Sequence, residues 1–215
     1  MFPISDVIPS RTRPVVTIAL IVLSSAAYFY QVWVDEATGR ALVFDHGVVP
    51  AALALSDLIT GMFLHADILH FGGNMVVLWI FGDNVEDRLG HGPYLAFYLA
   101  AGILAALAQV AADPSSQAPM IGASGAIAAV MGAYFMLYPQ SRVLTAVFLI
   151  VFMDVIEIPA LFFLGVWFLL QLAQGALHPS AGIAFWAHAA GFGTGCLVGL
   201  WLRSRTKSLE RYWAR

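Results

Sequence analysis

The chain of 215 residues is 60% hydrophobic and only 11% charged, with a mean hydropathy of +0.82 and a formal net charge of −3. This composition lies far from that of soluble domains and indicates a membrane protein. The few basic residues flank apolar segments, which argues against a nucleic-acid-binding surface. The single cysteine, Cys196, excludes an internal disulfide framework and a cysteine-based zinc site.

Six apolar segments are expected to be membrane helices, because a helix needs roughly 20 residues to cross the hydrocarbon. They cover residues of about 14–34, 69–85, 93–112, 123–138, 159–177 and 183–202. The sequence therefore predicts an all-α polytopic fold, with one membrane domain of six transmembrane helices. The first segment is too long to be the apolar part of a cleavable signal peptide, so none is expected.

Two stretches between these segments have apolar parts that are too short to cross. Residues 35–67 hold five acidic residues and one basic residue, Arg40, and are predicted to be an interfacial, partly embedded loop. Residues 143–153 are rich in β-branched and aromatic side chains and are followed by Asp154 and Glu157. This second stretch is predicted to be a surface or re-entrant excursion.

The distribution of basic residues predicts the orientation in the membrane. With six crossings both termini lie on one side, and the other side keeps only Arg40. The positive-inside rule then places both termini in the cytoplasm, whereas a seventh crossing through residues 143–153 would put the basic tail outside. The basic residues on the terminal side are Arg11, Arg13, Arg88, Arg142 and five in the tail after residue 202.

Four polar side chains fall at a comparable depth under this topology. Ser124 opens the fourth segment, His188 lies early in the sixth, and His70 and Asn74 share one helix face at the start of the second. A serine among small residues usually serves helix packing, and a His–Asn pair alone is more often structural. An ionisable side chain inside a span is costly and indicates function, and the common depth of the four favours a site.

Serine and histidine together predict nucleophilic catalysis. Ser124 needs a base to become a nucleophile, and neutral His188 is the only candidate of the right type. No carboxylate is expected at this depth, because Asp154 and Glu157 fall on the cytoplasmic side of the predicted topology. The prediction is therefore a Ser–His dyad, with water entering from the outside through a polar cavity.

The remaining polar groups are predicted to hold the oxyanion of a tetrahedral intermediate. The expected donors are the backbone N–H of Ser124 and the side chains of His70 and Asn74. Gly122 is assigned to the same oxyanion hole. No metal and no cofactor are expected.

These motifs, in this order, resemble those of the rhomboid family of intramembrane serine proteases. The family pattern is His-x-x-x-Asn in the second span, Gly-x-Ser-Gly at the start of the fourth, and a histidine followed by small residues in the sixth. The matching residues here are His70 with Asn74, Gly122-Ala123-Ser124-Gly125, and His188 with Gly191, Gly195 and Gly199. His65 and the acidic turn with Glu86 and Gly90 are also similar to family members, and the resemblance extends from about Arg13 to Leu202.

The resemblance implies a rhomboid-type bundle that hydrolyses peptide bonds in or near transmembrane segments of other membrane proteins. The cut would lie near the outer face, at small residues and in helices that unwind easily. The expected partners are transmembrane protein substrates and the lipid bilayer, with no nucleic acid. The fifth span, with Trp167 and three phenylalanines, would be a candidate lateral gate, although such aromatics more often face lipid.

One position departs from the family pattern. Rhomboids often carry an aromatic residue four positions after the serine, where it stacks on the catalytic histidine. Here Ala128 stands at that position. Another side chain must therefore pack against His188, or the histidine is held less firmly.

Three other functions fit the sequence less well. A non-catalytic binder of membrane segments is disfavoured by the intact Ser124 and His188. A transporter or channel is disfavoured because no repeated half with matched broken helices is present. A haem or metal protein is disfavoured because His65 and His70 are five residues apart and His-Glu-x-x-His is absent. The compact length without an organelle-type extension favours a prokaryotic inner membrane.

Overall fold

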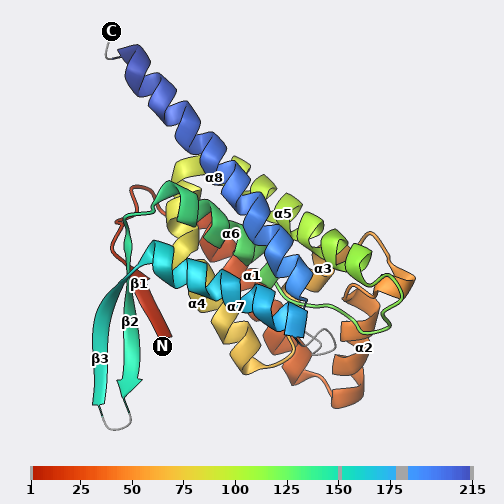
Figure 1. The fold of residues 1–215 in the computed structure, drawn as a ribbon. Helices are drawn as coiled ribbons and strands as arrows, with labels where there is room; N and C mark the ends of the chain where they lie inside the picture. The colour runs from red at the N-terminus through yellow and green to blue at the C-terminus, as the bar shows by residue number, and fades with distance from the viewer. Residues whose placement is uncertain (1, 150–151, 178–183, 214–215) are drawn as a thin grey trace.

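The computed structural model describes residues 2–149, 152–177 and 184–213. It is mostly helical, with the helices arranged around α6 and a small antiparallel sheet at one end (Figure 1). The helices are α1 (Val15–Trp33), α2 (Glu36–His46), α3 (Asp57–Thr60), α4 (Ile68–Leu89), α5 (His91–Ala112), α6 (Ser124–Leu137), α7 (Ala160–Leu177) and α8 (Phe185–Trp213), with 3₁₀ turns η1 (Pro50–Ala52) and η2 (Gly61–Phe63). The strands are β1 (Phe2–Asp6), β2 (Arg142–Leu149) and β3 (Phe152–Pro159).

A long helix lies in each of the six apolar segments, namely α1, α4, α5, α6, α7 and α8. Three of them, α1, α5 and the Phe185–Arg205 part of α8, are long and apolar enough to cross a membrane by length and composition. A fourth crossing is possible if the segment Asp57–Phe63 and α4, which meet at 96°, are counted together. The helices α6 and α7 are shorter and apolar. The structure therefore supports a polytopic fold with three or four spans, and six crossings stay a prediction.

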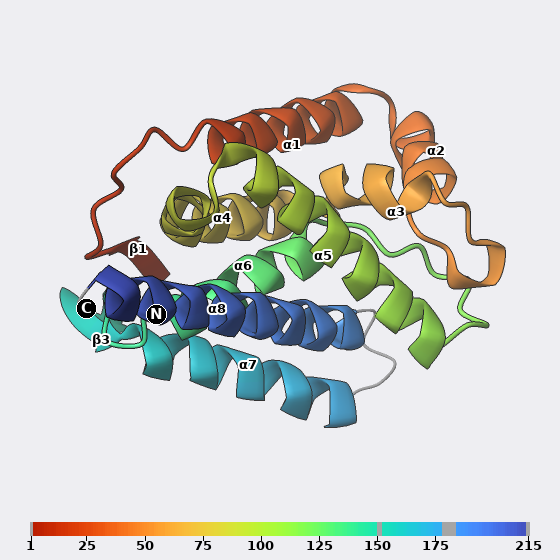
Figure 2. The same ribbon diagram turned by 90° about the horizontal axis from the view of Figure 1, so that it is seen from above.

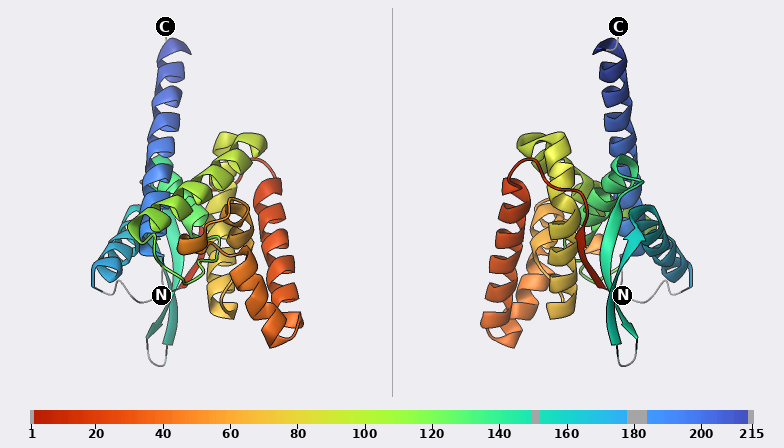
Figure 3. Two further views of the ribbon diagram at one scale, coloured as in Figure 1. Left: turned by 90° about the vertical axis from the view of Figure 1, so that its right-hand side faces the viewer. Right: turned by 90° about the vertical axis from the view of Figure 1, so that its left-hand side faces the viewer.

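The expectation of an all-α fold is wrong for residues 142–149 and 152–159. They form an antiparallel hairpin in which Arg142 pairs with Pro159 and Leu149 with Phe152. The N-terminal strand β1 adds to its edge, with Asp6 opposite Val143. β-branched side chains are stiff and fit an extended, pleated backbone, which explains why this stretch forms strands. Its place at the membrane surface or as a re-entrant excursion stays a prediction. Figure 3 shows the hairpin and the C-terminal end of α8 projecting from opposite ends of the molecule.

The stretch predicted as an interfacial loop contains the short helices α2 and α3 and the turns η1 and η2. The side chain of Asp35 accepts a hydrogen bond from the backbone N–H of Thr38 and so caps α2. Val48 and Met120 exchange two backbone hydrogen bonds, of 2.9 and 2.8 Å. This bridge ties the stretch to the segment that leads into α6.

Helix α6 is the centre of the bundle. Its residues 126–134 are all buried, and most of them are small. The helix contacts α4, α5 and α8, and α7 lies on the outer side of α8 (Figure 2). Such close packing around small residues is typical of helix association in membranes. It fixes the position of the residue that begins α6, which is Ser124.

A buried carboxylate joins α4 to α1. Glu86 accepts hydrogen bonds from the backbone N–H groups of Val16 and Thr17, at 2.9 and 2.8 Å, and from the Thr17 hydroxyl at 2.7 Å. His91 contacts the same carboxylate at 2.6 Å. The first N–H groups of a helix have no partner within it, so Glu86 satisfies those of α1 from a neighbouring helix. The acidic turn noted in the sequence thus fixes the start of α1.

Candidate active site

A tight turn places Ser124 at the start of α6. Gly122 has a φ of 114°, a value that side-chain-bearing residues rarely adopt, and its backbone N–H donates to the carbonyl of Gly61 at 2.8 Å. This backbone conformation leads the chain into α6, which begins at Ser124. The N–H of Gly122 is thus already bonded, and the place of this residue in an oxyanion hole stays a prediction.

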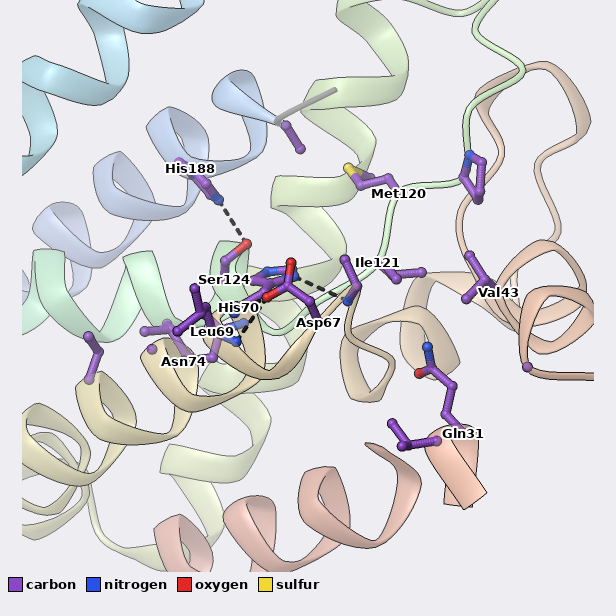
Figure 4. Close-up of a pocket in the computed structure, with 18 of the residues that line it drawn as sticks. Gln31, Val43, Asp67, Leu69, His70, Asn74, Met120, Ile121, Ser124 and His188 are labelled. Atoms are coloured by element: carbon purple, nitrogen blue, oxygen red, sulfur yellow. Dashed lines mark hydrogen bonds between the residues drawn. The ribbon is translucent and has the colours of Figure 1, made fainter. Parts of the chain in front are cut away.

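His188 meets Ser124 across the contact between α6 and α8. The Nε2 atom of His188 lies 2.8 Å from the hydroxyl oxygen of Ser124, within hydrogen-bond distance (Figure 4). His188 is buried in the bundle. The two residues are separated by 64 positions in the chain. The serine and the histidine proposed from sequence are thus brought together by the fold.

Glycines on α8 allow this approach. A Cβ atom at Gly191 would overlap the carbonyl oxygen of Gly125, and one at Gly195 would overlap the carbonyl oxygen of Ala129. A Cβ at Gly132 of α6 would likewise overlap the carbonyl of Phe192. The backbones of α6 and α8 are therefore in direct contact, which is the geometry that small residues give to membrane helices.

His70 and Asn74 approach the serine from α4. Asp67 begins this helix by accepting hydrogen bonds from the backbone N–H groups of Leu69 and His70, at 2.9 and 2.8 Å. The ring of His70 lies against Gly122, close to where that residue's Cβ would be. Figure 4 shows Ser124 between His188 on one side and the His70–Asn74 pair on the other.

The amide nitrogen of Asn74 is buried and has no hydrogen-bond partner among the described residues. A buried donor without a partner costs free energy, so natural proteins rarely keep one without a reason. Asn74 Nδ2 is 3.7 Å from the position of a Cβ on Gly122, which directs it toward the serine turn. The site therefore holds a donor that is available to an added group.

Two side chains of α7 surround His188, and neither was assigned to the site from sequence. The Nδ1 atom of His188 lies 2.7 Å from Oε1 of Gln171. The ring of Trp167 packs at a centroid distance of 6.0 Å from the imidazole, tilted by 41°. Trp167 thus packs against the candidate-site histidine His188, as the aromatic residue four positions after the serine does in the family pattern, where this chain has Ala128. A glutamine in an apolar helix was the available signal for Gln171, because polar side chains in spans are costly and indicate partners.

A cavity of about 1150 Å³ lies over the serine and the histidine. Besides these two residues, its lining includes His70 and Asn74 from α4, Gln171 from α7, and parts of α1 and α2. Besides Glu36 of α2, the wall of the cavity holds the carboxylate of Asp67. That carboxylate is bonded to the start of α4 and no described bond joins it to His188.

Across residues 2–149, 152–177 and 184–213, no group of three or more histidine, cysteine or acidic side chains is placed to hold a metal ion. The lone Cys196 is partly buried on α8.

These features define an integral membrane protein whose helical bundle encloses a serine and a histidine in contact. Residues 53–205 match the family model of the rhomboid domain, which is well over half of the chain. The chain belongs to the rhomboid family.

Curated relatives carry rhomboid names. The chain is 27% identical over 183 residues to the mitochondrial presenilin-associated rhomboid-like protein of Bos taurus, covering 84% of this chain and 46% of the relative. It is 31% identical over 96 residues to the mitochondrial rhomboid protein 1 of Saccharomyces cerevisiae, covering 43% and 28%. It is 42% identical over 76 residues to the rhomboid protease GluP of Bacillus subtilis, covering 35% and 14%. The chain thus spans less than half of the length of each of these relatives.

Proposed function

We propose that the chain is an intramembrane serine endopeptidase that hydrolyses peptide bonds in or near transmembrane segments of other membrane proteins. The observation that carries the proposal is the 2.8 Å contact between Ser124 Oγ and His188 Nε2 inside an apolar bundle. A nucleophile and a base within hydrogen-bond reach are the signature of covalent catalysis. Family membership and the name of the Bacillus subtilis relative, a rhomboid protease, support the same chemistry.

In the acylation step the Ser124 oxygen attacks the carbonyl carbon of the scissile peptide bond, and its proton passes to Nε2 of His188. The tetrahedral intermediate then collapses, the C–N bond breaks, and the imidazolium returns the proton to the leaving amine. A water molecule that enters through the cavity next attacks the acyl-enzyme, with His188 again accepting and returning the proton. The serine ends the cycle unchanged, and no metal or cofactor is consumed.

The proposed oxyanion hole has three donors. The backbone N–H of Ser124 belongs to the first turn of α6, where N–H groups have no acceptor within the helix. Asn74 Nδ2 is buried without a partner among the residues that the structure describes, and the ring of His70 lies against the serine turn. Each donor aimed at the developing charge is worth about a hundredfold to a thousandfold in rate. The amino-terminal end of α6 adds a partial positive charge on the same side.

The proposed membrane arrangement has six crossing helices, with both termini in the cytoplasm and cleavage near the outer face. It is supported by the helices found in the six apolar segments and by the basic residues on the terminal side. Two of the relatives named above are mitochondrial and one is bacterial, so these names do not favour the prokaryotic inner membrane over the mitochondrion. The proposal is therefore limited to an integral, multi-pass location.

The test is cleavage of a single-span reporter in liposomes by wild type, Ser124→Ala and His188→Ala. We expect both substitutions to reduce cleavage by about three orders of magnitude or more, because the nucleophile and its base act as a unit. Ser25→Ala is the control, since the Ser25 hydroxyl only bonds the carbonyl of Ile21 within α1. A fluorophosphonate should label wild type and Ser25→Ala covalently and leave Ser124→Ala unlabelled.

Equal reporter cleavage by wild type and Ser124→Ala, with both proteins folded, would overturn the proposed chemistry. A wild type that binds the reporter without cutting it would also overturn it, and would point to a non-catalytic binder of membrane segments. Melting temperatures of the variants in detergent establish that the comparison is between folded proteins.

A further inference from the structure

Helix α7 contacts α8 through a face that includes the neighbourhood of His188. Trp167 and Gln171 lie four residues apart on α7, and His188 and Phe192 lie four residues apart on α8, so each pair shares one helix face. The Trp167 ring lies 6.0 Å from His188 and 6.3 Å from Phe192, and Phe168 stacks on Phe192 at 4.5 Å. Figure 2 shows α7 running alongside α8. The aromatic contacts hold α7 at the distance that Gln171 needs to reach the histidine.

Both nitrogens of His188 have partners. Nε2 lies 2.8 Å from Ser124 Oγ, and Nδ1 lies 2.7 Å from Gln171 Oε1. A neutral imidazole carries one N–H, and its other nitrogen can only accept. If Ser124 is to donate its proton, Nε2 must be the accepting nitrogen, so the proton sits on Nδ1 and is donated to the amide oxygen of Gln171. The partner of one nitrogen thus decides the role of the other.

We propose that Gln171 is a positioning residue that holds His188 in the tautomer and ring orientation required of the base. The proposal rests on the proposed function and assigns to an uncharged amide the task that a carboxylate performs in Ser–His–Asp triads. An amide oxygen gives the same directional hydrogen bond without an ionised group in the hydrocarbon, where a charge is costly. The site is therefore a Ser–His–Gln array in which the third member comes from α7.

The other polar groups near His188 cannot take this task. Two carboxylates line the cavity. Asp67 is bonded to the backbone N–H groups that begin α4, and Glu36 is paired with Arg40 on α2. His70 lies against Gly122 on the other side of the serine. Trp167 contacts the imidazole as a tilted ring and is not among its hydrogen-bond partners. Among the described residues, the acceptor bonded to Nδ1 is Gln171.

The first test compares kcat and KM for reporter cleavage by wild type, Gln171→Met and Gln171→Glu. Methionine has a similar shape to glutamine but offers only a weak hydrogen-bond acceptor. We therefore expect kcat to fall about ten- to a hundredfold with little change in KM, which is the cost of losing a hydrogen bond to a group that becomes charged. Glutamate keeps an acceptor oxygen at the same place, so Gln171→Glu should retain kcat within about tenfold of wild type. Leu170→Met, which introduces the same side chain at an exposed neighbour on α7, should behave as wild type.

The second test reads the tautomer without catalysis. In protein labelled with ¹⁵N-histidine, and with the His188 signal assigned by its loss in His188→Gln, wild type should show a protonated Nδ1 and an unprotonated Nε2. Gln171→Met should show both tautomers, whereas Leu170→Met should show the wild-type pattern. This readout is unaffected by whether the serine performs chemistry, and a merely structural glutamine would leave it unchanged.

The outcomes separate the two proposals. Wild-type cleavage that depends on Ser124, together with an unchanged kcat and an unchanged tautomer in Gln171→Met, would overturn the role of Gln171 and leave the protease intact. Equal losses of kcat in the methionine and glutamate variants would also overturn it, because the acceptor would then not be what matters. Absence of serine-dependent cleavage in wild type would overturn the proposed function itself.

Discussion

Gly122 is the residue on which the geometry of the serine turn depends. Its φ of 114° lies in a region where a side chain is strained, and a Cβ would fall 2.7 and 2.8 Å from the Cε1 and Nε2 atoms of His70. The same backbone therefore turns the chain into α6 and leaves room for a proposed oxyanion donor. Although its N–H is bonded to Gly61, Gly122 contributes to the site through shape.

Adding one methyl group at position 122 should lower the activity and, separately, the stability of the fold. We expect Gly122→Ala to lower kcat at least about tenfold, because His70 must move, and to destabilise the fold by about 1–3 kcal/mol of backbone strain. Gly72→Ala is the matched control, since a Cβ there meets nothing within 4 Å. Reporter kinetics and melting temperatures measure the two effects. Wild-type kcat in Gly122→Ala would show that His70 is not positioned as proposed.

The side chains around the serine divide into those that the sequence indicated and those that it did not. Ser124, His188, His70 and Asn74 stood out because polar residues in apolar helices are costly and these four fell at one predicted depth. Gln171 shares the first property and was missed. Its partner lies 17 residues away on another helix, and the contact depends on how α7 rotates against α8, which no local pattern encodes.

At the scale of elements, the site depends on the crossing of α6 and α8. Gly191 and Gly195 of α8 lie directly against the backbone of α6, whereas Gly193 lies between them on another face with nothing near its Cβ position. One helix therefore carries glycines of two kinds. Those at the crossing bring His188 to Ser124, and the one outside it is free to be larger.

We expect Gly195→Ala to push α8 away from Ala129 and to cost about 1–3 kcal/mol, the usual penalty of overpacking. Activity should fall further than stability accounts for, because the contact between His188 and Ser124 would lengthen. Gly193→Ala, on the same helix, should be neutral or slightly stabilising, since alanine favours the helix. Unfolding in a denaturing detergent and reporter cleavage measure the pair. Similar behaviour of the two variants would contradict the packing described here.

The six apolar helices could be located from sequence because length and hydropathy are local properties. The sheet could not be located in this way, because β1 lies at the start of the chain and pairs with β2. Asp6 of β1 is separated by 128 residues from Tyr134 of α6, to which it is bonded, and by more from its partners in β2. The β-branched composition of residues 143–153 indicated that this stretch does not cross the membrane, but composition alone did not specify the pairing of Arg142–Leu149 with Phe152–Pro159. In the 35–67 stretch, helices of 4 to 11 residues were too short to give a periodic pattern.

At the scale of the whole molecule, the N-terminal segment joins the sheet to the bundle. Asp6 of β1 accepts hydrogen bonds from the hydroxyl of Tyr134 on α6 and, at 3.1 Å, from the side-chain amide of Asn84 on α4. Further along, Thr12 bonds Asp87 near the end of α4. The carboxylate of Asp6 therefore connects three elements that are far apart in the chain, at the end of α6 opposite to Ser124.

Burial raises the pKa of Asp6 to about 6, opposed by the hydrogen bond from Tyr134 and reinforced by the nearby Asp83. The unfolded chain has the ordinary value of 3.8, so between these values the folded protein binds more protons than the unfolded one. The free energy of unfolding should consequently fall as pH rises through this window, and the part due to Asp6 should be fully present below it.

Melting temperatures of wild type in detergent from pH 4 to 7 should decline, and those of Asp6→Asn, which keeps an acceptor for Tyr134 but cannot ionise, should decline less. Carboxylates remote from Asp6 contribute equally to both proteins, so the difference between the two curves reports Asp6 together with its coupling to Asp83. Parallel curves would mean that its carboxyl group titrates alike in the folded and unfolded chain, and that the link between β1 and α6 does not depend on its protonation.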